Sequence, residues 1–143
     1  MIKQTCYVSL CQAGADGRVL SMFRDILTVS QRNNRANGLS GYLLFDRHYF
    51  AQVLEGDPRV VDATIARIKD DPRHRDIVLL GYRERRVRQF EGWAMGGAMI
   101  EAIHDREILL RRGLDSKGWQ RKLDGEGLIN LALDFAASRS TDI

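Results

Sequence analysis

Two apolar segments, separated by only three polar residues, constrain the fold of this chain more than any other feature. Residues 39–45 and 49–55 are largely apolar, and Asp46-Arg47-His48 lies between them. A short polar break between two apolar runs of strand length is typical of a β-hairpin. Because apolar residues occupy both faces of each strand, the pattern predicts that the hairpin lies inside a sheet rather than at its edge.

The segments around this hairpin predict three more strands and two helices. An apolar stripe at helical spacing begins at Val19 and ends at Asn37-Gly38, and Asp57-Pro58 starts a second helix with a capping residue and a first-turn proline. The expected strands are residues 2–10, 77–82 and 93–100. Residues 77–82 have the pattern of a buried strand. The order β-α-β-β-α-β-β predicts an α+β protein with a ferredoxin-like sheet, an added fifth strand and both helices on one face.

The C-terminal part of the chain is expected to be helical. Residues 105–112 and 125–137 have helical patterns, and the second segment carries an apolar face formed by Leu128, Leu131, Ala132 and Phe135. The second face of the predicted sheet would otherwise be exposed, so we expect these helices to pack on it. The chain would then divide into a sheet domain, residues 1–103, and a helical extension, residues 104–143.

Composition and charge exclude several classes of protein. The 143 residues fit one domain, with 44% hydrophobic and 29% charged residues. No apolar run reaches the length of a membrane span and the N-terminus lacks a signal-peptide pattern, so we expect a cytoplasmic protein that does not bind membranes. The net charge is +3, and the densest basic cluster, residues 83–88, has only Phe90 as a neighbouring aromatic. We therefore expect no nucleic-acid partner.

Cysteine and histidine usage argues against a disulfide or a metal centre. Cys6 and Cys11 fall on one predicted strand at positions of opposite parity, so their side chains point to opposite faces. The three histidines form no pair at metal-ligand spacing. We expect structural cysteines and no metal.

Polar side chains interrupt two of the predicted buried surfaces. Ser30, Asn33 and Asn34 continue the apolar stripe of the first helix, and Gln52 lies between two apolar residues on one face of a hairpin strand. A buried amide without a partner costs about 1–3 kcal/mol. Each residue alone suits a helix cap or a backbone contact, but four that converge indicate a ligand.

Side-chain amides suit a ligand whose edge alternates donors and acceptors, because one CONH2 group offers both. A flavin ring has such an edge. The nucleophile and base pairs that covalent catalysis requires, and the paired acids of general acid–base catalysis, cannot be assembled from this sequence. The pattern therefore predicts a binding pocket and no enzyme active site.

A series of short motifs follows the same predicted elements. They are Tyr7-Val8-Ser9, Ser30-Gln31-Arg32-Asn33-Asn34, Gly38-Leu39-Ser40-Gly41, Phe50-Ala51-Gln52-Val53-Leu54-Glu55-Gly56, Asp71-Pro72-Arg73-His74 and Trp93-Ala94-Met95. In this order and at these spacings, residues 2–100 resemble the BLUF domain, a family of flavin-binding blue-light sensors. The resemblance implies a photoreceptor that binds FAD without a covalent bond, with FMN or riboflavin as alternatives, and that is not an enzyme.

The resemblance also implies a role for each polar residue of the pocket. Tyr7 would give an electron and a proton to the excited flavin. Gln52 would bridge the tyrosine hydroxyl and the flavin and would rearrange its hydrogen bonds on illumination. Asn34 would bond the polar edge of the ring, with Ser30 and Asn33 nearby.

Two further groups of residues receive roles from the resemblance. Arg73 and His74 would lie near the ribityl and phosphate end of the cofactor, with Asp71 ordering the turn. Trp93 and Met95, on the last strand, would pass the hydrogen-bond change towards the C-terminal helices. Trp93 and Met95 also suit ordinary core positions, and His74 suits an ordinary surface position.

By this resemblance residues 1–103 are the flavin-binding sensor and residues 104–143 a cap and output extension. No effector domain is expected after the sensor, so output would act in trans, through a partner protein or a change in self-assembly, and a homo-oligomer is expected. Trp119 and the apolar face of residues 128–135 are the candidate contact surface. Two alternatives remain open: a flavin-dependent redox enzyme, although no nicotinamide fingerprint is present, and a ferredoxin-like regulatory module that holds an amino acid or a nucleotide.

Overall fold

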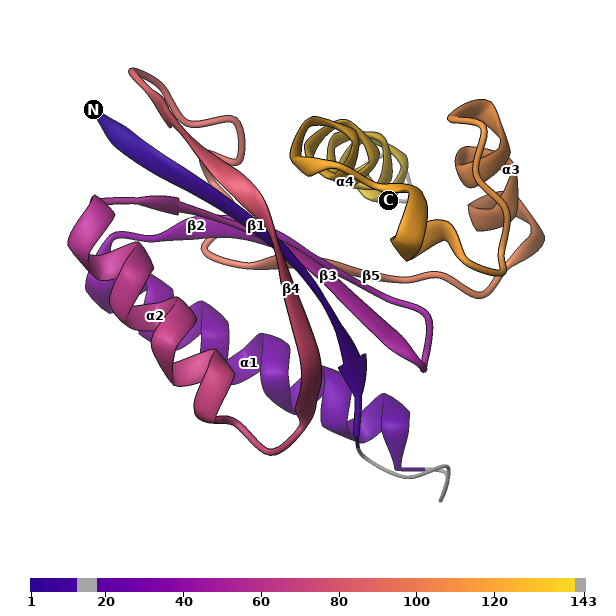
Figure 1. Ribbon diagram of the computed structural model, residues 1–143, viewed down its shortest axis with the longest axis horizontal. Helices are drawn as coiled ribbons and strands as arrows, with labels where there is room; N and C mark the ends of the chain where they lie inside the picture. Colours follow the sequence, from indigo (N-terminus) through magenta and orange to yellow (C-terminus); the bar gives the residue numbers. More distant parts are fainter. Residues whose placement is uncertain (13–17, 141–143) are drawn as a thin grey trace.

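A single mixed sheet forms the centre of the computed structural model, which describes residues 1–12 and 18–140 (Figure 1). Its strands are β1 (Ile2–Cys11), β2 (Ser40–Phe45), β3 (Tyr49–Gly56), β4 (His74–Arg85) and β5 (Gly96–Met99). Their order across the sheet is β4-β1-β3-β2-β5, and neighbours are antiparallel except β2 and β5, which are parallel. This confirms the predicted ferredoxin-like arrangement with an added fifth strand.

Helices cover both faces of the sheet. Figure 1 shows α1 (Val19–Asn37) and α2 (Pro58–Asp70) on one face, and α3 (Ile103–Arg111) and α4 (Gly125–Ser140) on the other. A short 3-10 helix, η1 (Trp119–Lys122), joins α3 to α4. The predicted placement of both helix pairs is confirmed. No helix in the described part of the chain has the length and apolar character that a membrane span needs.

The predicted end signals of α1 and α2 are present. The Asp57 carboxylate accepts hydrogen bonds from the backbone N–H groups of Arg59 and Val60, at 3.0 and 3.4 Å, and so caps α2. α1 ends at Gly38, whose φ of +69° lies in the left-handed region that glycine adopts without strain. Both helices therefore join the hairpin through tight connections, which place them over the same face of the sheet.

The hairpin lies in the interior of the sheet, as its two apolar faces predict. Each residue of β2 is buried, and so is each residue of β3 except Tyr49 at its start. One core, under α1 and α2, includes Tyr7 and Phe45, and a second core, under the C-terminal helices, includes Cys6. Cys11 packs against the first core, so the two thiols lie on the opposite faces that their parity predicts.

The apolar face of the C-terminal extension closes the protein's own core. Trp119, Leu128 and Phe135 are each fully buried, together with residues of β1, β2 and β3. The indole N–H of Trp119 donates to Asp46 Oδ2 at 2.8 Å and ties η1 to the hairpin turn. The prediction that this face contacts a partner protein is therefore wrong, because burying it against the sheet already removes it from water.

Two strands differ from the sequence prediction. β4 is an edge strand, paired only with β1, and its residues Val78, Leu79 and Tyr82 are 54%, 46% and 68% exposed, so it is not the buried strand that its apolar run suggested. β5 begins only at Gly96. Trp93 and Met95 therefore precede the last strand instead of lying on it.

Candidate functional site

A cavity of about 220 Å³ lies between α1 and α2, against β1, β2 and β3. Its apolar wall includes Ile26, Leu43 and Leu54. It is also lined by the eight residues that the sequence analysis assigned to a cofactor, namely Tyr7, Ser30, Asn33, Asn34, Gln52, Asp71, Arg73 and His74. The fold thus brings together polar residues from β1, α1, β3 and the turn between α2 and β4.

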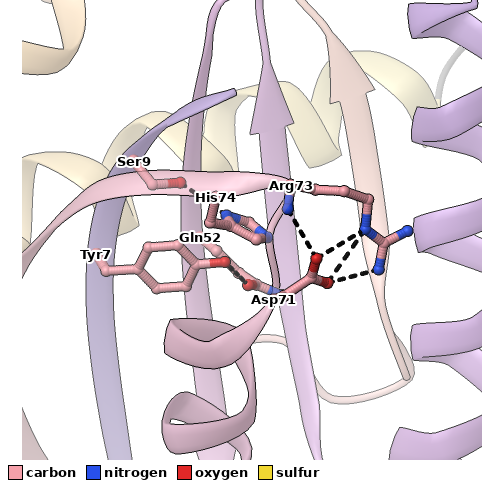
Figure 2. Close-up of polar contacts among 6 residues, drawn as sticks. All are labelled: Tyr7, Ser9, Gln52, Asp71, Arg73 and His74. Atoms are coloured by element: carbon pink, nitrogen blue, oxygen red, sulfur yellow. Dashed lines mark hydrogen bonds and ion pairs between the residues drawn. The ribbon is translucent and has the colours of Figure 1, made fainter. Parts of the chain in front are cut away.

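Tyr7 and Gln52 form the centre of the site. They are direct partners in the β1–β3 register, and the Tyr7 hydroxyl donates a hydrogen bond to Gln52 Oε1 (Figure 2). Gln52 Nε2 donates to the sulfur of Met95 at 3.4 Å. Burial raises the pKa of the Tyr7 hydroxyl far above its ordinary value, and the nearby Asp71 carboxylate raises it further. The phenol therefore stays protonated and acts as a hydrogen-bond donor.

Two amides of α1 hold the segment that carries Met95. Asn34 Nδ2 donates to the carbonyl oxygen of Ala94 at 2.7 Å, and Gln31 Nε2 donates to that of Met95 at 3.0 Å. Asn34 is buried, so its side chain braces this segment rather than capping the helix. Gln31 was assigned no role from sequence. Its position three residues before Asn34, on the same side of the helix, is the signal that identifies it.

His74 lies beside Tyr7 in the same pocket (Figure 2). Its Nδ1 shares a hydrogen bond of 2.8 Å with Ser9 Oγ, and its ring centroid lies 4.7 Å from that of Phe50 and 6.0 Å from that of Tyr7. Burial lowers the pKa of His74 below 6.5, Asp71 acts in the opposite direction, and Arg73 lowers the pKa further. The imidazole is therefore neutral at neutral pH.

The turn between α2 and β4 is braced by an ion pair. Arg73 Nη2 lies 2.6 Å from Asp71 Oδ2, and the backbone N–H of Arg73 donates to Asp71 Oδ1 at 2.9 Å. The Arg73 hydrogen bonds hold the pKa of Asp71 below its ordinary value. Arg67, to which the sequence assigned no role, also lines the cavity. It follows Thr64, another lining residue of α2, by three positions, and this helical spacing is the signal that identifies it.

Trp93 lies away from this pocket. It is 36% exposed, and its ring packs edge-on against Tyr42 with 5.8 Å between centroids. Tyr42 belongs to the core under the C-terminal helices. Of the two residues expected to relay a signal, Met95 is the one whose side chain contacts Gln52.

The residues of the cavity fit a flavin. Phenol and amide groups converge in a cavity that otherwise has apolar walls, which suits a flat ring with a polar edge. Gln52 Nε2 has a sulfur atom as its acceptor, and sulfur accepts weakly, so its second N–H can serve a stronger acceptor. Arg67 and Arg73 line the cavity near the α2–β4 turn, where guanidinium groups would match phosphate oxygens. Within residues 1–12 and 18–140, no three metal-ligating side chains gather into a group that could hold an ion.

Comparisons with known proteins agree with this chemistry. Residues 2–96 match the family described as BLUF, sensors of blue-light using FAD. The photoactivated adenylate cyclase subunit beta of Euglena longa is 32% identical over 79 residues, which cover 55% of this chain and 9% of that protein. The blue light- and temperature-regulated antirepressor BluF of Escherichia coli K12 is 29% identical over 104 residues, covering 70% and 25% of the two chains. The solved ground state of BlsA superposes with a TM-score of 0.80 at 26% identity, covering 93% of this chain and 88% of that one.

Together with this family match, the fold and the pocket are those of a flavin-binding photosensory domain. The chain belongs to the BLUF family of blue-light sensors. It spans 9% of the length of the Euglena longa cyclase subunit that it matches, so the activity of that whole protein does not follow from this similarity.

Proposed function

We propose that light switches this domain through a hydrogen-bond rearrangement at Gln52, with Tyr7 as the group that gives and recovers an electron and a proton. The observation that carries the proposal is that a single amide is bonded at both ends. Gln52 accepts from the Tyr7 hydroxyl and donates to the Met95 sulfur. A change at Tyr7 therefore alters the contact with Met95 as well.

The flavin that we place in the cavity is FAD, with FMN or riboflavin as alternatives. When bound, it supplies the absorption of blue light and a group that accepts an electron. Tyr7, Gln52 and Asn34 would meet the polar edge of its ring, and Ser30 and Asn33 would lie close by. Asp71, Arg73 and His74 would lie towards the ribityl chain and phosphates.

The amide of Gln52 has two arrangements of unequal energy. In the described one, its oxygen faces the Tyr7 donor and its N–H faces the Met95 acceptor. Turning the amide, or converting it to its tautomer, would place a donor opposite Tyr7. A turned amide would also bring its oxygen next to the Met95 sulfur. A thioether sulfur has no hydrogen to donate, so this contact would form no hydrogen bond. We expect the two amide arrangements to differ in free energy by a few kcal/mol. Electron and proton transfer at Tyr7 can overcome this difference, and the same difference then drives recovery in the dark.

The path of the signal leads from Met95 into β5 and the C-terminal helices. Met99, at the end of β5, accepts a hydrogen bond of 3.1 Å through its carbonyl oxygen from Arg139 of α4. Arg139 also pairs at 2.8 Å with Asp105, whose carboxylate is nearly fully buried at the start of α3. We therefore propose that residues 1–103 act as the sensor and residues 104–143 as the output extension.

We further propose that the output acts in trans in the cytoplasm, on a partner protein or a second copy of the chain. This proposal includes no membrane or nucleic-acid partner and no catalysis by the chain itself. The names of two relatives couple light to a cyclase and to an antirepressor. The exposed apolar residues of α3, Ile103 and Leu110, lie two helical turns apart on the helix that carries Asp105. Pulldowns and size-exclusion chromatography in dark and light should differ. Identical partners and oligomers in both conditions would refute output in trans.

Gln52→Leu tests the switch itself. The variant keeps the size of the side chain but removes both the acceptor for Tyr7 and the donor for Met95. We expect it to retain flavin and to lose the small reversible red shift that blue light produces. The flavin absorbance per protein serves as an internal control. A wild-type red shift in Gln52→Leu would remove this residue from the mechanism.

A further inference from the structure

A second cavity, of about 340 Å³, lies on the face of the sheet opposite the flavin pocket. Two cross-strand pairs line it on the side of the sheet, Val8 with Val78 and Leu10 with Tyr49. Side chains of directly paired residues lie on one face of a sheet. Leu123, which follows η1, lines the cavity from the C-terminal segment. The cavity is thus a gap between the sheet and the segment that covers it.

An unsatisfied acceptor belongs to the wall of this cavity. Gln120, from η1, lines it and is 4% exposed. In the described part of the chain, its Oε1 is buried and has no hydrogen-bond partner. Buried side-chain carbonyls are usually paired, because losing water without gaining a partner is unfavourable. A donor bound in the cavity would remove this penalty.

The fold holds Gln120 in place. Trp119, the preceding residue, is fully buried and bonded to Asp46, and Leu123 is buried in the same core. These contacts anchor the backbone of η1, which carries Gln120. A ligand would meet an acceptor that is already positioned, which lowers the entropic cost of binding.

The mouth of the cavity is open and carries balanced charge. Val78 is 54% exposed. The charged residues that line the cavity, Asp76 and Arg121, are exposed and of opposite sign. The remaining walls are mostly apolar, so a ligand with a net charge would lose hydration without gaining a buried counter-charge.

We propose that this cavity is a second ligand site, distinct from the flavin pocket, for a small neutral molecule that is mainly apolar and carries one N–H or O–H donor. The donor bonds to Gln120 Oε1, and the apolar part packs on the Val8–Val78 and Leu10–Tyr49 pairs. The volume lies at the lower end of the range for small-molecule sites, about 300–1,000 Å³, which suits one fused bicyclic ring.

Indole and benzofuran form a matched pair of probes, because they share a shape but only indole has the N–H donor. Each is titrated into the flavin-bound protein in the dark while backbone amide shifts are recorded by NMR. We expect saturable shifts at Val8, Leu10, Val78 and Gln120. Indole should bind about fivefold more tightly than benzofuran, which corresponds to one neutral hydrogen bond. Equal affinities would overturn the role of Gln120. Absence of saturation up to the solubility limit, or shifts centred on the flavin pocket, would overturn the site.

Two variants sharpen the test. Gln120→Met removes the acceptor at similar size, so indole should lose its fivefold advantage while benzofuran binds as before. Val78→Trp fills the exposed mouth and should abolish binding of both probes. Val87→Trp is its control, because Val87 is 64% exposed and does not line the cavity. Tight binding of indole to Val78→Trp would contradict the proposal, and the wild-type comparison remains decisive if Gln120→Met fails to fold.

Discussion

Tyr7 and Gln52 face each other across β1 and β3, and the hydroxyl of the tyrosine donates its hydrogen bond to the amide oxygen of the glutamine. The pairing follows from strand register, so the backbone ladder itself holds the two side chains together. Both are almost fully buried, which excludes bulk water as a competing partner. The opposite end of the Gln52 amide meets Met95, and this second contact makes the arrangement sensitive to substitutions in the segment before β5.

Met95→Leu should slow the return of the illuminated state to the dark state. Leucine fills a similar volume but provides no acceptor for Gln52 Nε2, so the dark arrangement loses a bond that the turned amide does not make. A loss of about 0.5–1 kcal/mol corresponds to a two- to fivefold slower recovery. Time-resolved absorbance in the dark measures the rate.

Met99→Leu is the control for this substitution. Met99 is also buried in the core under α1 and α2, but the residue bonded to the Gln52 amide is Met95. Its recovery rate should equal that of the wild type. Equal rates for Met95→Leu and the wild type would show that the sulfur does not favour the dark arrangement.

Glu55→Gln should destabilise the fold and loosen the loop that leads to Met95. The buried Glu55 carboxylate accepts hydrogen bonds from the side chains of Gln4 and Ser40 and from the backbone N–H groups of Gln89 and Phe90. A glutamine in its place would point its NH2 group at N–H or O–H groups that are themselves donors. We expect a loss of about 2–4 kcal/mol in the free energy of unfolding, measured by urea denaturation.

Glu84→Gln provides the comparison for Glu55→Gln. Glu84 is exposed on the edge strand, so the same chemical change should alter the free energy of unfolding by less than about 0.5 kcal/mol. If both variants unfold at the same urea concentration, the Glu55 network does not stabilise the protein.

His74 should make the flavin-free protein less stable in mild acid. Burial lowers the pKa of His74 in the folded protein below 6.5, so in this range the unfolded chain binds a proton that the folded chain does not. The free energy of unfolding therefore decreases as the pH falls below 6.5. The decrease stops once the pH is below the pKa of His74 in the folded protein, because both states then bind the proton. Urea midpoints should show a lower free energy of unfolding at about pH 5.5 than at neutral pH, by at most about 1 kcal/mol, the limit that the unfolded-state pKa sets.

Replacing His74 with asparagine should flatten this part of the stability profile. His48→Asn should leave it unchanged, because His48 is exposed in the hairpin turn. A profile for His74→Asn that matches the wild type would assign the pH dependence to other groups.

Much of the fold follows from local chemistry. The apolar hairpin, the Asp57 cap and the Gly38 stop each depend on residues close in sequence, so periodicity and capping patterns identify them. The polar residues of the pocket were also detectable, because Asn34 and Gln52 interrupt apolar faces. Their convergence required that α1 packs over β2, which is the neighbour of β3 in the sheet.

The remaining features depend on contacts distant in sequence. The apolar run in β4 resembles a buried strand, and only the order of strands across the sheet places it at an edge. The apolar face of α4 suggested both packing on the sheet and contact with a partner, and the structure shows that packing on the sheet buries it. Trp93 and Met95 share a motif, yet it is the Met95 side chain that contacts Gln52. Gln31 and Asn34 hold this segment through the carbonyl oxygens of Met95 and Ala94.

The absorption spectrum of the purified protein before and after blue light tests the central claim most directly. The account predicts a small red shift of the flavin band that reverses in the dark. It also predicts that the shift is absent in Tyr7→Phe, which lacks the donating hydroxyl, and intact in Tyr82→Phe, whose ring is 68% exposed on the edge strand. A wild-type protein that holds flavin and shows no shift, or a Tyr7→Phe variant that shifts like the wild type, would contradict it.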